Sequence, residues 1–339
     1  MKKLVLIGLF AGLYTSVNAQ ADKHFSMFAE TPVSLNPAAA GMHPGAIQLF
    51  TNFRMQWLTA SDNPFRTIAA SAEGRFFDQG NGHLGTGVAF YNDLAGDGLY
   101  QVNEVRIPIN YAISLSRTQY LSIGIQPGFY QRTLTSDNLT WESQWTGIAF
   151  NTATEANEAL LNENLNVSLF DMGAGIYWFG DISKNTKITL GLSGQHLTKQ
   201  DLNFFGNEDE LFRKLTFHGQ AEFKRQNSNL SYVPAFYTFF QGPNREFIFG
   251  SNFKYQLRGA SIHTGYFDEV SLSFGAYYRV GDALMANVIF DMAGFSVGAA
   301  YDLNISGLTV ATNGVGAMEF FLRYRLNFGG RSLANPRIH

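Results

Sequence analysis

The chain has 339 residues, a formal net charge of -3, no cysteine and no run of basic residues. The absence of cysteine excludes disulfides and thiol chemistry, and the charge gives no electrostatic basis for binding nucleic acid. Only 15% of the residues are charged, whereas 34 Gly, 31 Phe and 15 Tyr residues suit tight turns, a lipid-facing band and aromatic girdles.

The first residues predict a signal peptide. Lys2 and Lys3 precede an apolar run over 4–17, and Val17 and Ala19 are small residues at the two key positions of a cleavage site. The run is shorter than the roughly 18 to 20 apolar residues of a membrane helix. We therefore expect residues 1–19 to be removed, and since no later stretch could form a membrane helix, any membrane role must rest on strands.

The segment 20–45 does not alternate like a strand, and we expect it to lie on the periplasmic side. It contains Phe25 and Ser26, and then Asn36, Pro37 and Ala38 leading to Gly41. A proline-directed turn with small side chains permits close backbone approach. The segment could plug the periplasmic mouth or dock a partner, although the simpler reading, that it only fixes the entry into the first strand, is favoured.

From about residue 46 to 328 apolar and polar residues alternate. Ile47 and Phe53 point one way and Arg54 the other, because successive strand residues face opposite sides. Near the end of the chain Phe320 and Leu322 alternate with Glu319 and Arg323 in the same way. A soluble sandwich would need a second sheet over its apolar face. Together with the signal peptide, the pattern predicts an all-β fold, a transmembrane antiparallel β-barrel over residues 46–329.

Fourteen strands are the preferred count, followed by a tail over 330–339. A short stretch over 260–267 would make fifteen, which is disfavoured because bacterial barrels have an even number. The expected strands are 46–58, 66–77, 83–92, 99–116, 119–134, 167–180, 186–198, 213–226, 229–240, 246–257, 270–280, 284–292, 294–302 and 317–328.

The connections divide into short and long ones. Those at 116–118 and 226–228 would be periplasmic turns, and the longer ones at 135–166, 199–212 and 303–316 extracellular loops. Two of these loops hold clustered carboxylates that could bind Ca²⁺, but their irregular spacing favours solvated charge. The carboxylates are Glu155, Glu158, Glu163, Glu208, Asp209 and Glu210.

Four arginines fall on inferred lumen faces, where they avoid the roughly 2 to 4 kcal/mol that an arginine costs in the lipid midplane. They could line a conduit or bind a carboxylate, but pairing inside the lumen is favoured because buried charges are normally paired. The arginines are Arg54, Arg279, Arg323 and Arg325, and their expected partners are Asp291, Asp302 and Glu319.

No motif indicates catalysis, a metal or a cofactor, and we expect none of the three. The seven histidines lack metal-ligand spacing such as His-Glu-x-x-His, and no short motif signals seryl catalysis. The glycine pairs Gly85 with Gly87 and Gly173 with Gly175 lie within strands, and no helix start follows them as in a phosphate loop. They are expected to relieve crowding on the barrel wall.

Several short motifs follow one another along the chain, each occurring once. They are Phe25 to Phe28, Ser34 to Gly41, Arg54 to Trp57, Asn92-Asp93 with Gly96, Tyr278-Arg279 with Asp282-Ala283, Tyr301 to Leu308 and Gly316 to Glu319. In order and spacing they resemble the PorP/SprF family of Bacteroidetes outer-membrane proteins, which is associated with type IX secretion and gliding. The chain departs from the family at Glu30-Thr31-Pro32 and at Ala39, where the family often has Asn-Pro and an aromatic residue.

The resemblance implies a non-enzymatic barrel in the cell outer membrane. It implies recognition of a secreted cargo, such as a gliding adhesin, through its C-terminal sorting domain, and contacts with periplasmic ring or motor components of the secretion system. The remaining partner is outer-membrane lipid. Two alternatives stay open on the residues alone: a small-solute channel or transporter of porin type and, with less weight, an outer-membrane enzyme.

Overall fold

The structure, a computed structural model, describes residues 22–59, 63–77, 81–96, 100–135, 139–154, 156, 166–198, 211–259 and 269–326. The expected signal peptide, the stretch 260–267, the tail 330–339 and the carboxylates of the two loops lie outside the described residues.

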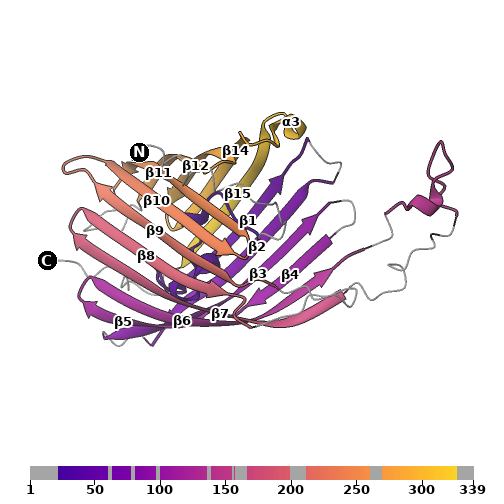
Figure 1. Ribbon diagram of the computed structural model, residues 1–339. Helices are drawn as coiled ribbons and strands as arrows, with labels where there is room; N and C mark the ends of the chain where they lie inside the picture. Colours follow the sequence, from indigo (N-terminus) through magenta and orange to yellow (C-terminus); the bar gives the residue numbers. More distant parts are fainter. Residues whose placement is uncertain are drawn as a thin grey trace, which may run out of the picture.

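The described strands form one closed antiparallel sheet (Figure 1). Apart from β4 and β5, which both pair with β3 and β6, each strand pairs with the next along the chain, and β1 pairs with β15 to close the wall. The strands are β1 (Ile47–Gln56), β2 (Phe65–Phe76), β3 (Gly82–Ala95), β4 (Tyr100–Arg106), β5 (Ile109–Ser116), β6 (Gln119–Thr133), β7 (Asn166–Ser183), β8 (Thr186–Gln195), β9 (Lys214–Lys224), β10 (Leu230–Gln241), β11 (Asn244–Arg258), β12 (Val270–Arg279), β13 (Ala283–Met292), β14 (Phe295–Asn304) and β15 (Val315–Leu326).

Two of these elements, β4 and β5, are halves of one strand. Both pair with β3 on one side and with β6 on the other, and they are separated only by Ile107 and Pro108. Proline has no N–H to give to the sheet, so the ladder is interrupted there. The wall that the described residues form therefore has fourteen strands, and the predicted fourteen-stranded barrel is confirmed.

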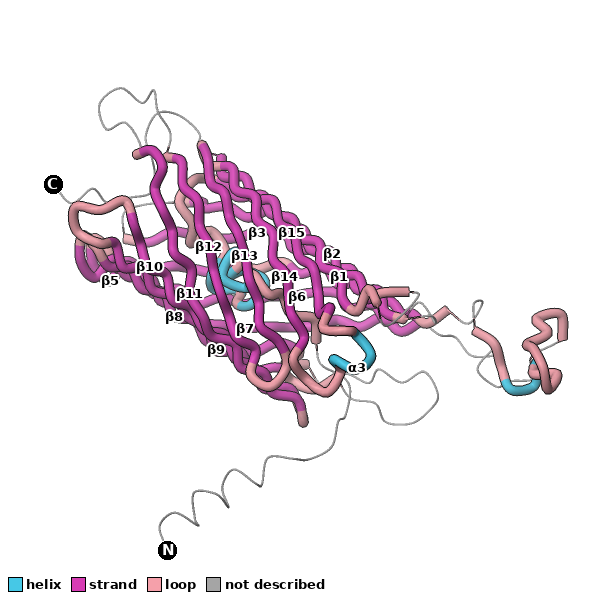
Figure 2. Tube along the Cα trace, turned by 90° about the horizontal axis from the view of Figure 1, so that it is seen from above, coloured by secondary structure: helices cyan, strands magenta, loops and turns pink. Residues whose placement is uncertain are grey.

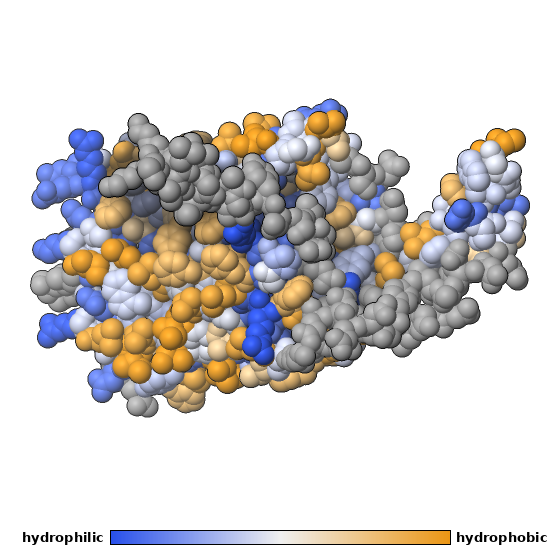
Figure 3. All heavy atoms as spheres, in the orientation of Figure 1, coloured by the Kyte–Doolittle hydropathy of each residue, from blue (hydrophilic) through white to orange (hydrophobic). Residues whose placement is uncertain are grey.

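Side chains alternate between the two faces of the wall. On the outside, Phe249 is 53% exposed and Phe320 52%, while Glu319 and Arg323, the neighbours of Phe320 and Leu322, are buried inside. On the face shown in the space-filling view, apolar residues spread over the strands and hydrophilic residues gather at one end of the barrel (Figure 3). An apolar outer wall and a polar lumen are the two faces that a barrel in a membrane requires.

The two ends of the barrel differ. We call the end where β1 finishes, at Gln56, the long-loop end, because the connections 134–165 and 196–213 emerge there. The other end, where β1 begins at Ile47, is called the short-turn end and has two-residue turns such as 184–185. In outer-membrane barrels short turns face the periplasm and longer loops the exterior. No helix in the described part of the chain is long and apolar enough to cross a membrane.

The segment that precedes β1 lies inside the barrel. It forms three short helical turns, η1 (Phe28–Glu30), α2 (Pro32–Leu35) and η2 (Pro37–Ala39). The tube view shows these helical turns surrounded by strands (Figure 2). The expectation of a segment outside the barrel on the periplasmic side is wrong for the described residues 22–45, because their side chains satisfy buried groups of the lumen wall. Residues 22–45 are called the plug below.

Candidate functional site in the barrel interior

The plug runs through the lumen from the long-loop end to the short-turn end. At its start, the backbone N–H of Asp22 donates to Gln241 Oε1 at 2.9 Å, where β10 finishes. Near its other end, the N–H of Gly41 donates to Glu73 Oε2 at 3.0 Å, and Glu73 lies close to the end of β2 at the short-turn end. The segment thus occupies the axis of the barrel before the chain turns back into β1.

Ser26 is the centre of a buried polar network. Its N–H donates to Glu319 Oε2 at 2.6 Å, and its hydroxyl lies 2.7 Å from Asp302 Oδ1. Arg54 donates to the same two carboxylates, at 3.1 Å to Glu319 and 3.0 Å to Asp302, and also to the Ser26 hydroxyl. The plug is therefore tied to β1, β14 and β15, the strands that close the barrel.

A second arginine extends this network around the lumen. Arg279 on β12 donates to Asp302 at 3.3 Å and to Asp282 at 3.1 Å. Its Nε also lies 3.5 Å from Glu246, which is 3.5 Å from the His24 ring on the plug. Burial, followed by the positive charges of Arg279 and Arg54, lowers the pKa of His24 well below its usual range, so His24 is neutral at pH 7.

The first residue of the described plug has its own set of partners. The Asp22 carboxylate lies 3.2 Å from Lys214 Nζ and 3.4 Å from His196 Nε2. Burial opposes ionisation of this carboxyl, but Lys214, Lys23 and His196 outweigh it and hold the pKa of Asp22 well below its usual range. The plug therefore begins with a charge that is neutralised by the wall of the barrel.

Three apolar side chains of the plug each enter a separate cluster on the wall. Phe25 packs with Ala69, Ala89 and Tyr91. Phe28 stacks on Tyr237 with ring centroids 5.4 Å apart. Met27 joins the cluster of Phe50, Ile289, Ala300 and Phe321. Because the three residues point in different directions from one short stretch, they fix its position across the lumen.

The lower stretch, Asn36 to Gly41, is bound through backbone groups. The Asn36 side chain donates to the Ile176 carbonyl at 2.9 Å and accepts from the Ala38 N–H at 3.0 Å. Asn110 on β5 donates to the carbonyls of Pro37 at 3.1 Å and Ala40 at 2.7 Å. Pro37 and Ala38 are both buried. This stretch could not lie so close to the strands with larger side chains.

Two wall glycines permit that approach. A Cβ atom added at Gly85 would lie 2.0 Å from the Ala40 carbonyl oxygen, and one at Gly175 would lie 2.1 Å from Asn36 Oδ1. The expectation that these glycines only relieve crowding within the wall is therefore incomplete, because these two make room for the plug. Their partners Gly87 and Gly173 do lie against wall groups, the Ala72 and Gly194 carbonyls.

The two remaining arginines lie nearer the short-turn end. Arg323 bridges Glu30 of the plug at 2.6 Å and Asp291 of β13 at 3.2 Å. Arg325 donates through its Nε to Gln48 at 2.7 Å. Of the expected partners, Asp302 and Glu319 thus contact Arg54, and Asp291 contacts Arg323, whereas the hydrogen-bond partner found for Arg325 is an amide.

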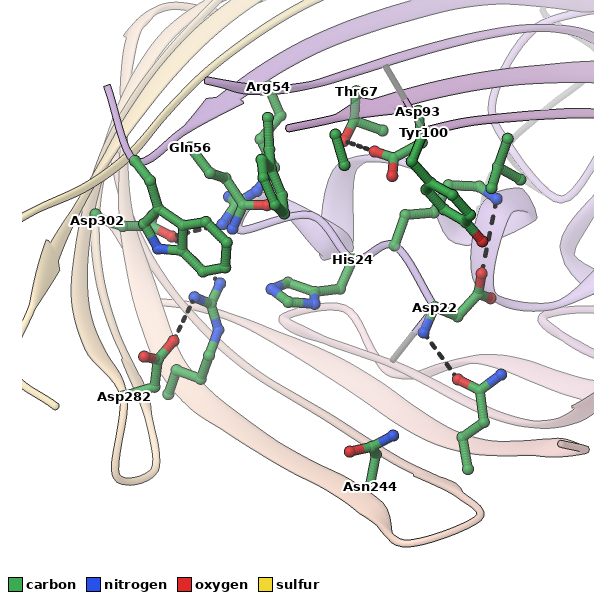
Figure 4. Close-up of a pocket in the computed structure, with 18 of the residues that line it drawn as sticks. Asp22, His24, Arg54, Gln56, Thr67, Asp93, Tyr100, Asn244, Asp282 and Asp302 are labelled. Carbon is green, nitrogen blue, oxygen red and sulfur yellow. Dashed lines mark hydrogen bonds and ion pairs between the residues drawn. The ribbon is translucent and has the colours of Figure 1, made fainter. Parts of the chain in front are cut away.

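Above the plug, on the side of the long-loop end, lies a cavity of about 620 Å³ (Figure 4). Its floor is the start of the plug, Asp22 to His24, and its walls come from strands on all sides. Figure 4 shows the His24 ring and the Tyr100 ring projecting into it. The lining includes Arg54, Gln56, Trp57, Phe65, Asp93, Tyr100, Arg132, Asn244, Arg279, Asp282 and Asp302.

The side chains of the barrel interior bind the plug and thereby close the lumen. Among the described residues, no group of three His, Cys, Asp or Glu side chains is arranged to hold a metal ion. Arg54 and Arg279 already share the carboxylate of Asp302 with each other, so they are not free to bind the carboxylate of a ligand.

The sequence does not reveal which of the inward-facing residues contact one another. Arg54 and Glu319 are direct cross-strand partners in β1 and β15, although 265 positions separate them. No motif in the sequence indicates that Asn110 binds the plug backbone or that Glu246 lies beside His24 of the plug. The available signal was the period-two pattern, which puts Glu246 and Asn110 on inward positions, and the non-alternating stretch before β1.

The fold is similar to that of one solved channel protein, and two further solved structures superpose less well. The monoaromatic hydrocarbon channel CymD superposes with a TM-score of 0.51 at 10% identity, with 88% of this chain and 93% of that chain covered. The Pseudomonas putida toluene transporter TodX gives 0.48 at 9% identity, with 88% and 93% covered, and a Pseudomonas aeruginosa FadL homologue 0.46 at 9%, with 86% and 93% covered.

The closed wall with an apolar exterior and a polar interior, together with the likeness to CymD, defines an outer-membrane β-barrel protein. No curated protein matches the chain. Residues 17–324 match the family described as type IX secretion system membrane protein PorP/SprF, and the chain belongs to this family. The predicted family and the predicted location in the outer membrane are confirmed.

Proposed function

We propose that this barrel is a non-enzymatic accessory of type IX secretion that supports secretion or surface anchoring of one specific cargo. The cargo would be recognised through its C-terminal sorting domain, and periplasmic ring or motor components would contact the short-turn end. Family membership supports the secretion role, and the choice of an accessory role over a conduit rests on the barrel interior.

The occupied lumen is the observation that carries this proposal. The plug is held at both ends and in the middle, by the Ser26 network, by Phe28 and by the hydrogen bonds around Asn36. A path for a protein, or for a solute through a porin, would require this whole segment to leave. A closed barrel is better suited to hold a partner on its outer rims than to conduct one.

The long-loop end offers a surface for such a partner. The connection between β6 and β7 carries a small hairpin closed by the bridge Trp145–Phe150, which stands away from the barrel (Figure 1). Ile148 at its tip is 91% exposed. Within the β14–β15 connection, α3 (Thr309–Thr312) likewise exposes Val310. Aromatic and aliphatic side chains on extended loops are common anchors in protein interfaces.

The proposal is tested by deleting the gene and measuring surface display of each type IX cargo. One cargo should disappear from the surface while the others are secreted normally. Replacing 139–154 by a short Gly/Ser turn should reduce display of the same cargo without loss of the heat-modifiable barrel. As a control, the turn 184–185 at the other end of the barrel is replaced by a longer Gly/Ser turn, which should leave display of the cargo unchanged.

Two results would overturn this function. If the deletion blocks every type IX substrate equally, the barrel is a general component. If the intact protein conducts small solutes in planar bilayers while cargo display is normal, the porin-type alternative is the better account.

A further inference from the structure

The cavity above the plug is electrically balanced. Among its lining residues four are cationic, Lys23, Arg54, Arg132 and Arg279, and four are anionic, Asp22, Asp93, Asp282 and Asp302. Many of these charges pair with each other, as Arg279 does with Asp282. A ligand with a strong net charge would therefore meet as much repulsion as attraction, so the cavity favours a neutral, polar ligand.

Among the uncharged side chains of the lining, two polar atoms have no hydrogen-bond partner in the described part of the chain. These are His24 Nε2 on the floor and Asn244 Nδ2 at the start of β11, both buried. Buried polar atoms are nearly always hydrogen-bonded. A ligand hydroxyl can both donate and accept, so it suits the unpaired nitrogen of a neutral imidazole and the amide donor of Asn244 alike.

Aromatic side chains form the other part of the lining. Trp57 and Phe65 meet edge to face with centroids 4.6 Å apart, and both line the cavity, as does Tyr100. Trp57 has a φ of 58°, a left-handed conformation that is rare for a bulky residue, and its N–H is fixed by the Gly316 carbonyl at 2.9 Å. Such strained positions cluster at ligand-binding sites.

We propose that this cavity binds a neutral pyranose sugar, either free or as the terminal unit of a glycan. A pyranose has apolar C–H faces that suit the aromatic wall, and a rim of hydroxyls that suits carboxylates, amides and an imidazole. About 620 Å³ is within the usual size of small-ligand pockets. The inference goes beyond the role in secretion and does not depend on it.

The test uses the full mature barrel in lauryldimethylamine oxide, because maltoside and glucoside detergents would themselves supply sugar. Maltose, lactose and N,N′-diacetylchitobiose are titrated by calorimetry, and each is also offered on beads through its reducing end. Binding to the beads would show that the cavity accepts the terminal sugar of a longer glycan. Binding of the free sugar alone would show that it accepts only an enclosed small ligand. Either result supports a cavity that binds a neutral pyranose.

The variants Trp57→Ala and Asn244→Ala should weaken binding at least tenfold. Trp145→Ala, which removes a tryptophan of the outer hairpin at the same end of the barrel, should leave binding unchanged within about twofold. If Trp57→Ala loses the heat-modifiable fold, Asn244→Ala decides the test.

Three outcomes would overturn the inference. They are no binding of any of the three sugars even at tens of millimolar, binding that survives both cavity variants, and tighter binding of anionic sialic acid than of the neutral sugars. Binding of an uncharged Ser/Thr/Asn peptide in place of sugars, lost in Trp57→Ala, would assign the cavity to a peptide instead.

Discussion

The upper and lower parts of the plug are held in the lumen by different physical means. Asp22 to Glu30 is held mainly by ionised groups, above all the carboxylates of Asp302 and Glu319 and the guanidinium of Arg54. Asn36 to Gly41 is held mainly by neutral hydrogen bonds and by close contact with glycines. The upper part therefore depends on charge balance, whereas the lower part depends on the shape of the wall.

Removing both parts together should have the largest effect. Deleting residues 25–41 leaves strand pairing intact, because β1 begins at Ile47 and closes on β15. We expect a heat-modifiable barrel that conducts ions in planar bilayers, whereas the intact protein stays closed. A truncated chain that cannot insert would show instead that the plug is needed for the fold.

The upper part is tested by Glu319→Gln. The substitution leaves the shape nearly unchanged but removes a buried charge that faces Arg54 at 3.1 Å. Breaking a buried pair on one side typically costs 3–5 kcal/mol, and since Asp302 still pairs with Arg54, we expect a loss of about 3 kcal/mol in the free energy of unfolding.

The measurement is unfolding in urea, followed by the gel shift of the folded barrel. Glu269→Gln is the matched control, because Glu269 forms a half-exposed pair with Lys254 at 3.3 Å. Exposed pairs contribute about 0–1 kcal/mol. Equal effects of the two substitutions would contradict a charge-dependent upper part.

The lower part is tested by Gly85→Ala. The new methyl group would lie 2.0 Å from the Ala40 carbonyl oxygen, so the plug must shift away from β3. Overpacking of this kind costs about 1–3 kcal/mol. In Gly173→Ala the nearest atom is a carbonyl oxygen at 3.3 Å, and this control should be nearly neutral. Protease cleavage within the plug should rise only in Gly85→Ala.

The smallest effect is expected from pH, through His43. Burial, followed by the positive charge of Arg325, lowers the pKa of His43 to about 3. A histidine with a lowered pKa contributes its stability above about pH 6.5, and the contribution is lost as the pH falls below that value. At pH 5 the loss should be about 2 kcal/mol at most. His43→Gln should remove this part of the pH dependence; an unchanged pH profile would contradict it.

The sequence predicts the strands of the barrel wall far better than the contacts inside the lumen. Alternation places Arg54, Glu319 and Asp302 on one face because the period of a strand is fixed. It cannot state which inward residues meet, since the pairing of Arg54 with Glu319 depends on closing the barrel between its first and last strands. The same applies to Gly85, whose role depends on Ala40 lying opposite to it.

The plug also could not be placed from its own residues. Its helical turns have three or four residues, which is too short for a periodic pattern in the sequence. The spacing of its apolar residues Phe25, Met27 and Phe28 does not distinguish the segment from an ordinary linker. The segment is stabilised inside the lumen by hydrogen bonds with buried polar wall residues, such as Glu73 and Asn110, and these partners are known only once the barrel is formed.

The central claim, that the chain closes its own lumen, is tested most directly by a cross-link in cells. The protein has no cysteine, so an engineered pair is the only possible intramolecular bridge. Met27 and Ala300 lie in one cluster inside the barrel, whereas Tyr301, the next residue, points outward. With a short bis-maleimide, which adds to one cysteine thiol at each end, Met27→Cys/Ala300→Cys should cross-link and Met27→Cys/Tyr301→Cys should not. Absence of the first cross-link in a folded barrel, or equal yields for both pairs, would contradict the plugged lumen.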